Sequence, residues 1–505
     1  MKGKRIFQNV FVSGWTRIVI MLLGLIMPRL LITSFGSEVN GLLSTVTQIF
    51  TYLALMEAGI GTSTINALYI PLAKDNHTQV NEIMTEARRY YRKVSWVYGA
   101  CILAFASLYP FLANSELSKL LIFEIIILQG AANFLNYYFS AVYNQFLMAD
   151  GRKYVLENIH FFSYVMQTVG KIILISLGFN VLVVQIMSLA MAILKIPILK
   201  IYTRRKYNWL NFETNPSQRY LKERKAFVVH EFSTLIFHNT DVFLVSAFSG
   251  FAIASVYAVY HMIYSSLYSL LSTVNSGLGF ILGKNTQKPK EELCCIYDMY
   301  NSLYMAASFI LFTVAVLLTR PFLKLYTAGI TDTNYLLPGL TLLFVVTNLL
   351  SSIRSIGSRL ITVSGHADKT KVRSLIEAGI NLVASLILVY FFGIYGVLLG
   401  TVVALLYRSN DIIIYANTRI LERSPLHDYI TIFAYTLAAI AIYYVVQWFN
   451  PAMNSYLSLF LYAILYIVVC AVIYVAIAIA LNIKAFRPYL IPLKNKLTAI
   501  VKRRT

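Results

Sequence analysis

Apolar residues along this chain come in long runs that short polar segments separate. A membrane-spanning helix needs about 20 mainly apolar residues, because its backbone hydrogen bonds must all close within the helix. Runs of that length recur fourteen times, and each predicts one spanning helix. Their approximate limits are 6–35, 39–72, 88–113, 118–148, 155–178, 180–202, 226–249, 251–283, 295–319, 333–362, 372–392, 395–418, 429–449 and 456–481. The sequence therefore predicts an all-α polytopic membrane protein.

The distribution of basic residues gives this arrangement an orientation. An even number of spans puts both ends of the chain on one side, and 33 of the 43 Lys and Arg residues fall on that side, against three on the other. Short loops rich in Lys and Arg stay in the cytoplasm, so both termini are expected there. Topology thus explains most of the net charge of +21, and we expect no nucleic-acid partner.

Composition excludes several other classes of protein. The chain is 58% hydrophobic and 13% charged, and its longest polar interval, from Tyr202 to Lys225, is too short for a soluble domain. The first apolar run resembles a signal peptide, but it contains Arg17 and lacks a small-residue cleavage site, so we expect it to be retained. Four cysteines without C-x-x-C spacing predict neither a disulfide framework nor a zinc site.

Two pairs of short motifs recur six spans apart. The basic turn at 148–153 is echoed at 363–369, and the glycine-rich element at 57–61 is echoed at 275–279. These echoes predict two six-helix lobes related as parallel repeats, with two C-terminal helices appended. The predicted parts are an N-terminal lobe (1–202), a cytoplasmic linker (203–225), a C-terminal lobe (226–418), spans 13 and 14 (429–481) and a basic cytoplasmic tail (482–505).

Three cations inside spans are the first candidates for a binding site. An Arg or Lys at mid-bilayer costs roughly 2.5–3.5 kcal/mol on insertion scales, so it needs a polar cavity, an acidic partner or a route to the interface. Arg17 lies on a stripe of small residues in span 1, and Arg354 lies on a Ser and Thr face of span 10. Lys171 shares the polar face of span 5 with Gln167, although snorkelling to the interface is an alternative.

Uncharged polar stripes extend this set. Span 4 presents Asn133 and Tyr137 on one face, where they could contact a sugar or form hydrogen bonds between helices. Arg408 and Asp411 are three residues apart in span 12, a spacing that favours a structural ion pair within the helix.

Acidic groups within spans suggest ion coupling. Asp241 lies well inside the apolar span 7, with His238 at the edge of its stripe, and Glu57 lies in span 2. Asp241 could bind a proton or sodium ion, or it could pair with an intramembrane Arg. For Glu57, the nearby glycines also suggest close helix packing.

Motifs for catalysis are missing from the sequence. There is no G-x-x-x-x-G-K-[ST] motif for ATP, and no H-E-x-x-H or G-x-S-x-G sequence occurs. We therefore expect a protein that is not an enzyme, uses no ATP and needs no cofactor or metal.

Several of these features together resemble the polysaccharide flippases of the Wzx type, in the multidrug/oligosaccharidyl-lipid/polysaccharide (MOP) exporter superfamily. The residues that carry the resemblance are Arg17, the stretch at 35–43, the element at 57–61 and Asn239-Thr240-Asp241. It implies a V-shaped, MATE-like transporter of the bacterial cytoplasmic membrane that moves an undecaprenyl-pyrophosphate-linked oligosaccharide outward. The product would be capsule, exopolysaccharide or O-antigen, and a glycan polymerase and a chain-length regulator are implied partners.

On this hypothesis, Arg17 and Arg354 engage the pyrophosphate with help from Lys171, while Asp241 or Glu57 couples ion binding to alternating access. Three alternatives stay open. A lipid II flippase of the MurJ type also has fourteen spans and cavity arginines. A MATE-type drug or cation antiporter usually has twelve spans, and a positive cavity disfavours its cationic substrates. A membrane-embedded glycan polymerase or ligase would change the length of the exported glycan.

Overall fold

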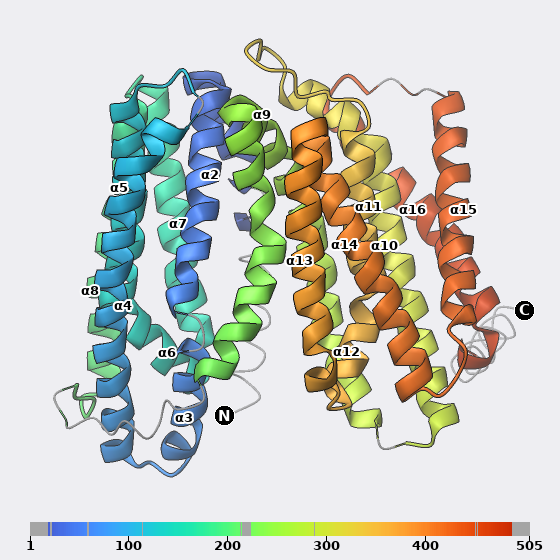
Figure 1. Cartoon of the computed structure of the whole chain (residues 1–505), viewed down its shortest axis with the longest axis horizontal. Coiled ribbons are helices and arrows are strands. Elements are labelled where there is room, and N and C mark those ends of the chain that lie inside the picture. Colours follow the sequence, from blue (N-terminus) through green and yellow to red (C-terminus); the bar gives the residue numbers. More distant parts are fainter. Residues whose placement is uncertain are drawn as a thin grey trace, which may run out of the picture. The chain divides into compact units, whose positions relative to one another are not determined.

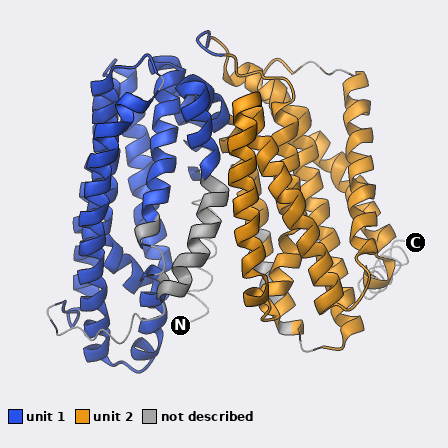
Figure 2. Cartoon of the chain, viewed as in Figure 1, with its two compact units in different colours: residues 1–259, 330–333 blue, residues 260–329, 334–505 orange. Residues whose placement is uncertain are grey.

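The computed structural model describes residues 19–20, 23–57, 60–113, 115–212, 214, 224–286, 288–449, 451 and 453–486. Within them, side chains are not described at 55–56, 62, 224–239, 273–274, 276–281 and 284. The described part of the chain contains helices and no β-strand. It divides into two compact units, one of residues 1–259 and 330–333 and the other of 260–329 and 334–505 (Figure 2).

Unit 1 contains the helices of the first half of the chain (Figure 1). A helix over Leu23–Phe35 is followed by α2 (Ser37–Leu53), the 3₁₀ turn η1 (Ala54–Glu57), α3 (Ile60–Ala73), α4 (His77–Leu112), α5 (Lys119–Leu135), the π-helical turn η2 (Asn136–Ser140), α6 (Ala141–Ala149), α7 (Lys153–Ser176), α8 (Val181–Lys206) and the first part of α9 (Arg224–Asn285).

Unit 2 begins within α9 and contains the helices of the second half. They are α10 (Lys290–Tyr326), α11 (Leu340–Ile353), α12 (Ser355–Val363), α13 (Ala367–Phe392), α14 (Ile394–Tyr415), the π-helical turn η3 (Ala416–Ile420), α15 (Leu426–Phe449) and α16 (Tyr456–Leu481).

The helices agree closely with the predicted spans. Among the described residues, eleven helices are long and apolar enough to cross a membrane. The lower number has three causes: span 1 is described only in part, η1 divides span 2, and α9 holds both span 7 and span 8. Gly250, with φ of +82°, interrupts α9 between those two spans. The prediction of an all-α polytopic membrane protein is thus confirmed.

The two glycines in the stretch at 35–43 are required for different reasons, one by its backbone conformation and one by helix packing inside unit 1. Gly36 precedes α2 with φ of +88°, a conformation that few other residues adopt. A Cβ on Gly41 would lie 1.8 Å from the carbonyl oxygen of Phe251, so α2 crosses the backbone of α9 where only a glycine fits. Next to this crossing, the Asn40 amide donates to Ser255 Oγ at 2.8 Å. Part of the sequence that carries the resemblance therefore joins two helices.

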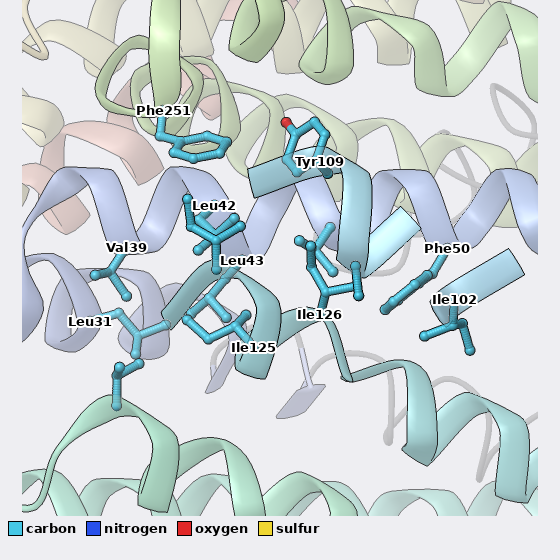
Figure 3. Packing of buried hydrophobic residues seen from close by; sticks show 14 of the residues in the cluster. Leu31, Val39, Leu42, Leu43, Phe50, Ile102, Tyr109, Ile125, Ile126 and Phe251 are labelled. Carbon is cyan, nitrogen blue, oxygen red and sulfur yellow. The ribbon is translucent and has the colours of Figure 1, made fainter. Parts of the chain in front are cut away.

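Apolar packing around this crossing forms a core of unit 1 (Figure 3). Side chains from α2, α4 and α5 interdigitate, and Phe251 of α9 closes the cluster beside Tyr109. This packing holds the helices that carry the polar residues described below. The buried members labelled in the figure are Leu31, Val39, Leu42, Leu43, Phe50, Ile102, Tyr109, Ile125, Ile126 and Phe251.

The two C-terminal helices pack on α10 in unit 2. The Tyr435 hydroxyl of α15 donates to the Ser302 carbonyl at 3.1 Å, and Thr313 of α10 shares a hydrogen bond of 2.8 Å with Tyr474 of α16. Spans 13 and 14 are therefore an integral part of this unit.

The two basic turns that suggested a repeat have the same geometry. Gly151 and Gly365 each end a helix with positive φ, of +72° and +74°. In each turn the next amide, of Arg152 or His366, donates to the carbonyl five residues earlier, at 2.8 Å and 3.0 Å. This is the usual way to end a helix with a left-handed glycine. The division into six-helix lobes at 1–202 and 226–418 itself stays a prediction.

Both helices before these turns are interrupted at the same place. Ser140 ends the π-helical turn η2, and Arg354 separates α11 from α12; each lies eleven residues before the glycine. At the second break, the Arg354 amide is 3.4 Å from the Leu350 carbonyl, which also accepts a hydrogen bond of 3.0 Å from Ser409 Oγ. Paired interruptions in the two halves of a transporter commonly mark its binding site.

Candidate substrate-binding and ion-coupling residues

The polar face predicted for span 5 lies against α8. Lys171 is 9% exposed, and its ammonium group is 3.5 Å from the Gln185 side-chain oxygen. One turn earlier, the Gln167 amide donates to Ser188 Oγ at 3.0 Å. The two predicted site residues thus belong to one polar seam between α7 and α8. Among the described residues, Lys171 forms no ion pair with a carboxylate.

A second cation lies farther along the same seam. The ammonium group of Lys195 on α8 lies 3.0 Å from the His160 ring of α7. Between the two lysines, Tyr164 points its hydroxyl toward the helix over Leu23–Phe35, where a Cβ on Gly24 would lie 3.7 Å away. Lys195 was not among the candidates selected from the sequence. Two basic side chains of the seam therefore have neutral partners.

Asn133 precedes the break in span 4, and Tyr137 lies within it. Tyr137 lies in η2, and its ring meets Tyr98 of α4 edge-on with 5.2 Å between ring centroids. The Asn133 amide lies beside the Tyr98 hydroxyl. A π-helical turn shifts the register of the side chains that follow it, and such turns are frequent at functional sites. The turn could not be seen in the sequence, because the hydrophobic pattern of span 4 is continuous.

Glu57 ends the 3₁₀ turn that interrupts span 2. The Tyr91 hydroxyl of α4 donates to Glu57 Oε1 at 2.9 Å, and the Gln145 amide of α6 donates to the Tyr91 hydroxyl at 3.1 Å. A Cβ on Gly61 would lie 2.9 Å from that amide, so the glycine makes room for Gln145. Glu57 is therefore part of a hydrogen-bonded group within unit 1.

Asp241 is buried near the start of the described side chains of α9. The Tyr257 hydroxyl, sixteen residues along the chain, donates to its carboxylate at 2.8 Å. The preceding residue, Thr240, shares a hydrogen bond of 2.5 Å with the Tyr52 hydroxyl of α2. A carboxylate in this position can bind a proton or a small cation.

The predicted site residue in unit 2 belongs to a network of charged side chains. Arg354, at the break between α11 and α12, donates to Glu377 of α13. The other carboxylate oxygen of Glu377 is 3.4 Å from Arg408 Nε on α14. Arg408 also pairs with Asp411, as predicted from their spacing, and Asp411 pairs in turn with Arg373. Sequence reasoning missed Glu377, whose partners lie on other helices.

Two predicted residues cannot be placed. Arg17 and the side chain of His238 lie outside the described residues. The remaining candidates in unit 1 are Lys171, Gln167, Tyr137, Asn133, Glu57 and Asp241, and the candidate in unit 2 is Arg354.

Comparisons with known proteins identify the fold. No protein-family model and no curated protein sequence matches the chain. A lipid II flippase, MurJ, in an inward closed conformation matches with a TM-score of 0.68 and 15% identity, covering 94% of this chain and 98% of that one. An inward-facing multidrug resistance MATE family transporter of the MOP superfamily matches with a TM-score of 0.66 and 16% identity, covering 81% and 98%.

A third match is an outward-facing MATE family transporter, with a TM-score of 0.55, 15% identity and coverage of 83% and 96%. The chain has the fold of these transporters. The flippase matches more of this chain than either MATE transporter does. The segment from α15 to α16 makes up about a tenth of this chain, which is similar in size to the difference in coverage. Identities of this size describe a shared architecture of membrane helices.

Proposed function

We propose that this protein is a flippase that moves a polyprenyl-pyrophosphate-linked oligosaccharide from the cytoplasmic to the outer leaflet of a bacterial cytoplasmic membrane. The oligosaccharide would be a repeat unit of a surface polysaccharide. The fold supports a transporter, and the residues of the polar seam support an anionic, sugar-bearing substrate. The observation that carries the proposal is the buried ammonium group of Lys171, which has a neutral partner at 3.5 Å.

The physical difficulty of this transport is the headgroup. The polyprenyl tail can stay in lipid, but a pyrophosphate cannot enter a low-dielectric region without cations, and sugars need hydrogen-bonding partners in place of water. A buried Lys without a carboxylate partner is itself unfavourable, and an arriving phosphate would compensate it. In this proposal Lys171, Arg17 and Arg354 engage the pyrophosphate, while Gln167, Asn133 and Tyr137 contact the sugars.

Ion coupling is assigned to the acidic residues of unit 1. Asp241 and Glu57 would take up a proton or sodium ion, with His238 assisting, and would thereby drive alternating access. Each carboxylate accepts a hydrogen bond from a tyrosine, a partner that suits either protonation state of a neighbouring acid.

A reconstituted system tests the proposal. The full chain is placed in liposomes with a fluorescent polyprenyl-pyrophosphate oligosaccharide, and an impermeant glycosidase reports how fast the label changes leaflet. We expect protein-dependent movement that falls in Lys171→Met and is largely kept in Lys171→Arg, which preserves the charge. Movement no faster than in protein-free liposomes would overturn the proposal.

The same liposomes distinguish two alternative functions by their substrates. A lipid II flippase would move a peptide-bearing lipid-linked sugar in preference to the oligosaccharide. Asp241 and Glu57 also favour a MATE-type antiporter, which would move an organic cation against an imposed proton or sodium gradient. Transport of the cation without movement of either lipid would assign the antiporter function instead.

A further inference from the structure

Among the described residues, the charged network of unit 2 has more cations than anions. It contains the three guanidinium groups of Arg354, Arg373 and Arg408 and the two carboxylates of Glu377 and Asp411, so its formal net charge is +1. Its inner members are buried: the side chains of Arg408 and Glu377 are 7% and 8% exposed. A network of this composition can accept one more negative group without burying a net negative charge.

Glu377 occupies a shared position in this network. One of its oxygens accepts from Arg354 and the other faces Arg408 Nε at 3.4 Å. If Arg354 moves away, the carboxylate keeps Arg408 as a partner. Release of Arg354 therefore leaves no isolated buried carboxylate, which is the usual reason that a buried ion pair resists opening.

Arg354 also lies at the break between two helices. It separates α11 from α12, and its amide is 3.4 Å from the Leu350 carbonyl. Ser409 of α14 already donates to that carbonyl at 3.0 Å, so a change at the break would not leave it without a hydrogen bond. The Arg354 side chain is 16% exposed, more than the side chain of either Arg408 or Glu377.

We propose that Glu377 is an internal anion that holds Arg354 until a phosphate group of the transported headgroup displaces it. This inference rests on the proposed function and deepens it: Glu377 sets the affinity and the release of the anionic substrate. The guanidinium group of Arg354 exchanges a carboxylate for a phosphate, both of which match its planar pair of donors. When the headgroup leaves, Glu377 takes Arg354 back.

Binding of inorganic pyrophosphate to the purified full chain in nanodiscs tests this exchange. If Glu377 occupies Arg354 for nine-tenths of the time, its neutralisation in Glu377→Gln lowers the apparent Kd about tenfold. Flipping by the same variant slows, because nothing displaces the headgroup. Asp411→Asn is the matched comparison: it also removes one carboxylate from the network, but one that pairs with Arg408 and Arg373, so its apparent Kd is expected to fall by much less than that of Glu377→Gln.

A second variant covers the case in which Glu377→Gln does not fold. Arg354→Gln leaves two cations and two anions in the network, so the fold is expected to persist, and pyrophosphate should bind at least tenfold more weakly. A purely structural role for Glu377 predicts that affinity and flipping fall together in Glu377→Gln. That result, or an unchanged Kd in Arg354→Gln, would overturn the inference.

The outcome is separable from that of the proposed function. Flipping by the wild type tests the function, whereas the opposite changes in Kd and rate test Glu377. A wild type that binds pyrophosphate with the expected pattern but moves no lipid would keep the exchange and remove the flippase function. A wild type that moves the lipid, with no tighter pyrophosphate binding in Glu377→Gln, would keep the flippase function and remove the exchange.

Discussion

The polar seam of unit 1 and the charged network of unit 2 give their cations different partners. In unit 2, Arg354, Arg373 and Arg408 each have a carboxylate partner. In the seam between α7 and α8 of unit 1, Lys171 and Lys195 have an amide and an imidazole instead. A guanidinium paired with a carboxylate offers an arriving anion only its remaining donors unless that carboxylate leaves, whereas an ammonium beside an amide has no competing anion. On the proposed function, the seam would be a permanent anion receptor and the network an exchangeable one.

The largest expected effect is on the stability of unit 2. Glu377→Gln leaves both Arg354 and Arg408 without this carboxylate, and removal of one partner from a buried pair costs about 3–5 kcal/mol. Thermal unfolding in anion-free buffer should show a large fall in Tm. An unchanged Tm would mean that the network is solvated in the membrane and that the contrast between the units is weaker than their contacts indicate.

The next effect separates transport from stability in unit 1. Lys171→Met removes a buried charge that has a neutral partner, so Tm should stay the same or rise. Leaflet exchange of the labelled lipid should nevertheless fall about tenfold, which corresponds to roughly 1.4 kcal/mol of lost interaction with the headgroup. A fall in Tm in parallel with transport would instead indicate that Lys171 has a structural role.

A smaller effect is expected at the exposed end of the network. The Arg373 side chain is 39% exposed, and Asp411 keeps Arg408 when Arg373 is lost. Arg373→Gln should therefore lower the free energy of unfolding by less than about 1 kcal/mol, as for other partly solvated pairs. A loss as large as that of Glu377→Gln would show that the five side chains act as one unit.

The smallest effect concerns the neutral partner in unit 1. The contact of Gln185 with Lys171 is long, at 3.5 Å, so Gln185→Leu should change the free energy of unfolding by about 0.5 kcal/mol or less. Thermal unfolding beside Glu377→Gln, in the same detergent, makes the comparison direct. A large loss here would mean that the amide is a strong partner and that Lys171 is not available to a headgroup.

The sequence predicted the helices well, because hydrophobic runs of spanning length are a property of the chain itself. It also predicted the pair of Arg408 and Asp411, whose spacing places them together on one helix. It could not predict that Arg354 meets Glu377, because that contact depends on how α11 and α13 pack. The π-helical turn at Tyr137 escaped for a related reason: the hydrophobic pattern continues through it without a Gly or Pro to mark the change of register.

The crossing of α2 and α9 at Gly41 has a consequence for motion within unit 1. With no side chain between them, the two backbones leave no soft layer that could absorb a relative displacement. A tilt of α2 must therefore also displace the α9 backbone at Phe251. A displacement of α2 is therefore transmitted to α9 one residue beyond the non-helical Gly250.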